Sequence, residues 1–222
     1  MSYMWNEFNI KTFPAETIVF RDGVYCPDLS TLPNAPINKQ YNLPVHVICD
    51  GEIAGDCELK VGVGSENQKV IISVNVKIKK PANFNILIQN AGKNSEISGT
   101  VMIDNQSELT YDCHAKHTFE NTAILIKTKI LAGKKSVSKL SGVATILKNC
   151  PDCKSEVSFV AMAENGAKID FMPAQRISSE PISAEHSASI YKPSDMQILY
   201  LRQAGLSGAE IDNVTKEAFL SE

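Results

Sequence analysis

Residues 70–78 read VIISVNVKI, in which every even-numbered residue is aliphatic and three of the four residues between them are polar. This period of two is typical of a strand with one buried face. Residues 84–88 and 124–130 repeat the pattern, and short runs of this kind, bounded by Gly, Asn, Asp and Lys, continue from about residue 45 to 190. Segments with helical periodicity are missing from this span, which argues against a fold of alternating strands and helices. The sequence predicts an all-β core.

A weak internal repeat bears on the type of β fold. The segment ISGTVMI at residues 97–103 returns as LSGVATI at residues 140–146, an interval of 43 residues. Such a repeat suggests stacked rungs, here two turns of about 21 residues each. A β-sandwich would bury the same alternation, so periodicity alone leaves the solenoid and the sandwich equally open.

The chain divides into three parts. Residues 1–44 carry half of the ten prolines, with one short strand expected at residues 17–20, and we interpret them as an irregular N-terminal cap. Residues 45–192 form the β core. Residues 193–222 are predicted to form two helices, because Ser194 with Gln197 and Ser207 with Glu210 have the spacing of capping boxes. From the residues alone, this helical pair could simply plug one end of the core.

Composition limits the partners. The formal net charge is -3 and no Lys/Arg-rich run occurs, so we expect no nucleic-acid partner. No stretch approaches eighteen uninterrupted apolar residues, which predicts no membrane span, and the N-terminus lacks the features of a secretory signal. We therefore expect a cytoplasmic protein whose six cysteines are reduced thiols.

Two groups of residues could bind a metal. Cys150 and Cys153 form a CxxC pair, whose spacing lets two thiolates hold one metal ion or exchange a disulfide, although Pro151 and Asp152 between them also suit a plain turn. Weaker candidates are Cys113, His114 and His117. In a strand, residues 113 and 117 share one face and residue 114 faces the other way, so core packing of Cys113 is the simpler interpretation.

The C-terminal part resembles the end of SufB/SufD proteins, which work in iron–sulfur cluster assembly. The resemblance rests on EHSASI at 185–190, YLRQAGLS at 200–207, AFL at 218–220, NGAKID at 165–170 with Pro173, and YDCHAKHT at 111–118. It implies a right-handed parallel β-helix with a short C-terminal helical appendage, which decides between the solenoid and the sandwich. The long N-terminal helical region of full-length members is not found in residues 1–44.

The resemblance also implies roles. Family members pair through their β-helices, so a homodimer or a heterodimer with a SufB/SufD relative is expected. They dock a SufC-type ABC ATPase with their terminal helices, here through Tyr200, Leu201, Arg202, Gly205, Leu206 and Phe219. His186 and Glu185, helped by a thiol of Cys150 or Cys153, are the candidates for holding a transient iron–sulfur cluster. Ser158 or Phe159 stands where SufB-type members have their assembly cysteine.

Three functions remain to be compared. The leading one is a non-enzymatic scaffold of the SUF system, because the chain has no phosphate-binding loop and ATP hydrolysis must come from a partner. The second is a structural relative that binds the ATPase without building a cluster. The third, a β-helix enzyme such as a lyase or an acyltransferase, lacks support, because no cluster of acidic and basic residues and no hexapeptide period occurs.

Overall fold

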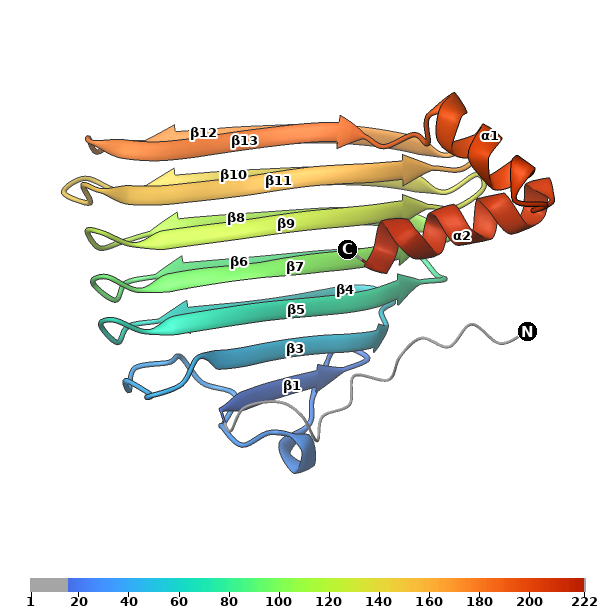
Figure 1. The fold of residues 1–222 in the computed structure, drawn as a ribbon. Helices are drawn as coiled ribbons and strands as arrows, with labels where there is room; N and C mark the ends of the chain where they lie inside the picture. The colour runs from blue at the N-terminus through green and yellow to red at the C-terminus, as the bar shows by residue number, and fades with distance from the viewer. Residues whose placement is uncertain (1–15, 222) are drawn as a thin grey trace.

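The strands stack into a two-sided solenoid, and Figure 1 shows the eight-stranded sheet in front of the five-stranded sheet. The computed structural model describes residues 16–221. Odd-numbered strands from β1 to β13, with β2 at the edge, form an eight-stranded sheet, and even-numbered strands from β4 to β12 form a five-stranded sheet. All pairs are parallel except β1 with β2. The strands are β1 (Thr17–Arg21), β2 (Val24–Tyr25), β3 (Val45–Glu52), β4 (Gly55–Val63), β5 (Lys69–Ile78), β6 (Ala82–Asn90), β7 (Glu96–Asn105), β8 (Glu108–His117), β9 (Ala123–Ala132), β10 (Val137–Ile146), β11 (Cys153–Ala163), β12 (Lys168–Ile177) and β13 (Ile182–Ile190).

The predicted parallel β-solenoid and the strand at residues 17–20 are confirmed, but the predicted rung length is wrong. Val70 of β5 lies beside Ile97 of β7, which lies beside Ile124 of β9, so one rung takes 27 residues here. The repeated segments begin at Ile97 in β7 and Leu140 in β10, which belong to opposite sheets. Their interval of 43 residues is therefore one and a half rungs, and not two rungs of about 21.

The space between the sheets is filled by the inward-facing side chains that the alternation predicts. Ile72, Val74 and Val76 are at most 1% exposed. The rings of Phe84, Tyr111, Phe159 and Phe171 follow one another with centroids 5.7 to 6.2 Å apart. Burial of these large side chains is the main stabilising contribution to such a fold.

The glycine in the second repeated segment has a packing reason. A Cβ atom added to Gly142 would lie 2.6 Å from Cε2 of Phe159. We therefore expect Gly142→Ala to lower the free energy of unfolding by about 1–3 kcal/mol, as overpacking of a core usually does. Urea unfolding measures the loss, and Phe159→Leu in the same chain should restore part of it. A Cβ atom on Gly208 meets no atom within 4 Å, so Gly208→Ala is the control and should not destabilise.

Two helices follow the last strand, α1 (Asp195–Gln203) and α2 (Gly208–Ser221). Both predicted capping boxes are present. The amide of Gln197 donates to Ser194 Oγ, and the amide of Ser207 donates to Glu210 Oε2 at 2.8 Å. The part of the chain that the structure describes holds no helix long and apolar enough to cross a membrane.

The second helix packs on the outer face of β9 and does not lie across the end of the solenoid (Figure 1). Phe219 is 6% exposed, and its ring stacks on Tyr191 with centroids 5.6 Å apart. Lys129 of β9, which points out of the sheet, is buried beneath the helix, and its Nζ donates to the carbonyl of Phe219 at 2.9 Å. A cation at this end of a helix is favourable, because the last carbonyls carry partial negative charge. Lys129 thus holds α2 against the sheet.

Candidate functional site

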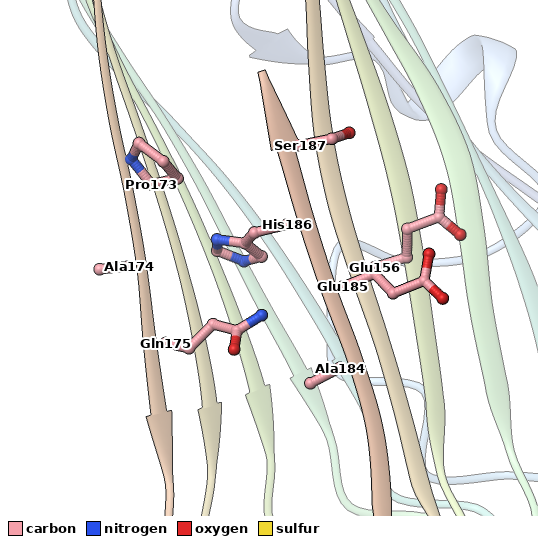
Figure 2. A pocket seen from close by; sticks show the side chains of 8 residues that line it. All are labelled: Glu156, Pro173, Ala174, Gln175, Ala184, Glu185, His186 and Ser187. Atoms are coloured by element: carbon pink, nitrogen blue, oxygen red, sulfur yellow. The ribbon is translucent and has the colours of Figure 1, made fainter.

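The site is built at the end of the solenoid where the last two strands lie. Within residues 16–221, β12 pairs only with β10 and β13 pairs only with β11, so each sheet ends in an unpaired edge. Between these two strands lies an open hollow of about 630 Å³. Figure 2 shows His186 of β13 and Gln175 of β12 pointing into it, with Pro173 beside them.

His186 points inward because of its register. It lies beside Val157 of β11, a core residue, so its side chain lies on the inner face of the sheet. Partial burial lowers the pKa of the imidazole below its usual value, which favours the neutral ring. Both ring nitrogens are buried and have no hydrogen-bond partner among the described residues. A neutral imidazole in this state can ligate a metal ion.

Glu185 lies on the opposite face of the same strand. It is the register neighbour of Glu156, and Figure 2 shows both carboxylates pointing to the opposite side from the ring of His186, although both residues line the hollow. Successive side chains of a strand point to opposite faces, so Glu185 does not orient the ring of His186 in its own chain.

The two thiols of the CxxC pair lie at a corner of the solenoid. Cys150 and Cys153 are 2% and 1% exposed, and Cys153 Sγ lies 3.2 Å from Thr122 Oγ1 and donates to the carbonyl of Phe119. The register neighbour of Cys153 in β13 is Ile182, four residues before His186. At roughly 3.3 Å per residue, the thiol and the imidazole are about 13 Å apart along the strand direction. The structure therefore does not bring these candidates together.

The three weaker candidates are separated as the strand alternation predicts. Cys113 is fully buried between the sheets, where burial raises the pKa of its thiol to about 12. His114 lies on the outer face of β8, with Nε2 2.9 Å from Thr145 Oγ1. His117 points inward, and its Nδ1 lies 2.8 Å from Thr122 Oγ1. Nowhere in residues 16–221 do three or more His, Cys, Asp or Glu side chains lie close enough to hold one metal ion.

Comparison with known protein families identifies the family of the chain. Residues 55–219 match the family described as SUF system FeS cluster assembly, SufBD core domain. The chain belongs to the SufB/SufD family. A search of curated proteins finds no match. The matched region begins with β4, includes the hollow around His186, and ends within α2. Membership of the SufB/SufD family associates the chain with SUF iron–sulfur cluster assembly.

The two residues that could occupy the position of the SufB assembly cysteine are Ser158 and Phe159, and neither is a thiol. Ser158 lies on the outer face of β11, and Phe159 fills the core between Tyr111 and Phe171. The residue beside His186 in the rung below is Val157. Sequence reasoning missed Gln175, which the alternation in β12 could have revealed, since it is the polar residue in an inward series that includes Phe171 and Pro173.

The residues that the SufB/SufD resemblance assigns to ATPase docking differ in accessibility. Tyr200 is 71% exposed, and Arg202 is exposed beside it on α1. Leu201 and Leu206 are half-buried, and Gly205 ends α1 with a φ of +89°. Phe219 is buried under α2, so its role is to anchor that helix. Met196, which no motif pointed to, is 73% exposed and lies four residues before Tyr200, on the same side of α1.

Proposed function

We propose that this chain is a scaffold subunit of a SUF assembly complex that works with a SufC-type ABC ATPase and holds cluster iron transiently at its open end. The observation that carries the proposal is His186, a half-buried imidazole that faces a hollow of about 630 Å³ and whose two buried nitrogens have no hydrogen-bond partner in the described part of the chain. Imidazole and thiolate are ligand types that iron–sulfur centres use. The scaffold is not an enzyme, and nucleotide is bound by the ATPase.

The open end is proposed to pair with a second SufB/SufD-type chain. What supports this is the pair of free edges on β12 and β13, since an unpaired strand edge is a template for another strand. Large apolar side chains also reach solvent there: Met172 is 51% exposed, Ile177 40% and Ile190 62%. Apolar surface of this kind is typical of an interaction site.

We propose that the partner supplies the thiolate ligands. Val157 is the neighbour of His186 in the rung below, and Cys153 is about 13 Å away along the strand direction. A homodimer would therefore bring two His186 imidazoles to the interface, but neither chain would place a cysteine thiolate beside them. A heterodimer with a SufB/SufD relative that carries a cysteine at its own open end completes a mixed ligand set. This replaces the earlier expectation that Cys150 or Cys153 helps His186.

Iron uptake tests the proposal. The chain, purified with its SufB/SufD partner and the ATPase, is incubated anaerobically with iron and sulfide, and visible absorption is recorded. We expect His186→Ala to lose at least half of the absorption, because one ligand is removed. His114→Ala, on the outer face of β8, is the matched control and should behave like the parent, as should Cys150→Ser/Cys153→Ser.

The structural-subunit alternative makes a different prediction in the same experiment. If the complex assembles and the His186→Ala variant takes up as much iron as the parent, His186 is not a ligand. If the parent complex binds the ATPase and takes up no iron, the chain is a structural relative that builds no cluster.

A further inference from the structure

Lysines gather at the corner of the solenoid where the eight-stranded sheet turns toward the five-stranded sheet. Lys134 and Lys135 are exposed in the turn between β9 and β10. Glu164 joins this turn to α2, because its Oε2 accepts from the amide of Lys134 at 2.8 Å and its Oε1 pairs with Lys216 Nζ. Glu164 therefore links the backbone of the β9–β10 turn to the side chain of Lys216.

The same corner two rungs away carries Lys79 and Lys80, in the turn between β5 and β6. The turns are stacked, because the amide of Gln106 donates to Ile78 and that of Gly133 donates to Asn105. With strands about 4.8 Å apart, two rungs separate the two lysine groups by about 10 Å. We call the five residues the basic corner: Lys79, Lys80, Lys134, Lys135 and Lys216.

The basic corner has an excess of positive charge that its neighbours do not balance. Glu164 pairs with Lys216, Glu52 pairs with Lys79 at 2.7 Å, and Asp104 lies close enough to both lysines to act on their charges, so three carboxylates face five lysines. Burial and the nearby charge of Lys134 lower the pKa of Lys216, as expected where like charges crowd. The chain as a whole carries a net charge of -3, so this corner has the opposite sign to the molecule.

The opposite corner of the same rungs carries lysines that are balanced by carboxylates. There the turns carry Asn67, Asn94 and Asn121, whose side-chain amides bond to one another, with Asn94 Nδ2 donating to Asn67 Oδ1 at 3.1 Å. Lys93 at that corner is paired with Glu120 at 2.6 Å. The excess of lysines over carboxylates is therefore a property of one edge and not of the solenoid turns in general.

The basic corner and α1 lie on the same side of the molecule, at the edge of the solenoid that carries the helices (Figure 1). Helix α2 has 14 residues and spans about 21 Å, with α1 at its N-terminal end and Lys216 near its C-terminal end. A standard interface buries about 800 Å² per partner, a patch roughly 30 Å across. One partner protein can therefore contact the apolar face of α1 and the basic corner together.

We propose that the basic corner is the second half of the ATPase docking surface and binds an acidic surface of the SufC-type ATPase. This inference rests on the proposed function. The exposed Met196 and Tyr200 supply apolar contact, while the lysines attract and orient the partner through charge complementarity. Five lysines beside a helix, on a molecule of net negative charge, suit an acidic protein surface better than the long phosphate backbone of a nucleic acid.

The test compares the full-length parent with Lys134→Glu/Lys135→Glu in titrations against the purified ATPase at 50 and 400 mM salt. Both lysines are exposed, so the variant should fold normally. We expect roughly ten-fold weaker binding at low salt and a shallower salt dependence, because two attractive contacts become repulsive. Lys148→Glu/Lys154→Glu makes the same change in net charge at the opposite corner and should bind like the parent.

Each outcome has one meaning. Equal affinity and equal salt dependence for parent and Lys134→Glu/Lys135→Glu would overturn the docking role of the basic corner and leave the proposed function standing. A parent that binds no ATPase at any salt concentration overturns the proposed function and the inference with it. Parallel titrations use a 30-nucleotide RNA and phosphatidylserine vesicles; saturable binding of either that depends on Lys134 and Lys135 would also overturn the assignment to the ATPase.

Discussion

Replacing Met196 and Tyr200 by Asp is expected to weaken binding of the ATPase more than thirty-fold. The two side chains are 73% and 71% exposed and lie one helical turn apart on α1, so together they form one apolar contact surface. Large apolar and aromatic anchors of this kind dominate interface energies, often by 2 kcal/mol or more each. Two buried carboxylates opposite an apolar partner surface add a desolvation cost.

The measurement is co-purification followed by calorimetric titration with the ATPase. Gln89→Asp/Thr110→Asp, on the exposed outer face of the five-stranded sheet, introduces the same charge and is the control. Point variants are preferable to removal of residues 194–222, because α2 covers Lys129 and its removal would expose that side chain. Unchanged affinity in Met196→Asp/Tyr200→Asp, with the helix content preserved, would show that α1 is not a docking helix.

The strand pattern could be predicted from the sequence because it is a local property. The alternation in residues 70–78 fixes which side chains of β5 face inward, and the pairs Ser194–Gln197 and Ser207–Glu210 fix where the helices begin. The rung length is not local. Strands of both sheets have the same alternation of inward and outward residues. The repeated segments at Ile97 and Leu140 therefore come from strands of opposite sheets. Only the hydrogen-bond register reveals the 27-residue rung.

The candidate site was predictable in part. His186 was identified through its resemblance to a family motif, and the opposite orientation of Glu185 follows from strand alternation alone. The distance between Cys153 and His186 depends on register across the corner, which no local pattern gives. The burial of Lys129 was the least predictable feature from the sequence. An outward lysine in a strand is normally solvated, and this one is buried because it contacts Phe219, ninety residues later.

Substitution of His117 by Asn is expected to remove most of the acid sensitivity of the fold. His117 is fully buried, and burial lowers the pKa of its imidazole from about 6.5 to about 4. The unfolded chain therefore takes up a proton before the folded chain does. Stability from this group is complete above pH 6.5 and is lost as the pH falls toward 4, by about 3 kcal/mol in full and about 2 kcal/mol between pH 7 and 5.

Asn is the appropriate replacement because the preceding rung already uses it. Asn90 is the register neighbour of His117, and its side chain bonds to Ser95, five residues later, as His117 bonds to Thr122. Urea unfolding at pH 7 and pH 5 should show a drop of about 2 kcal/mol in the parent and a much smaller drop in His117→Asn. His114→Asn, on the outer face, should retain the parent's drop. Equal drops in the parent and His117→Asn would mean that His117 does not control the acid response.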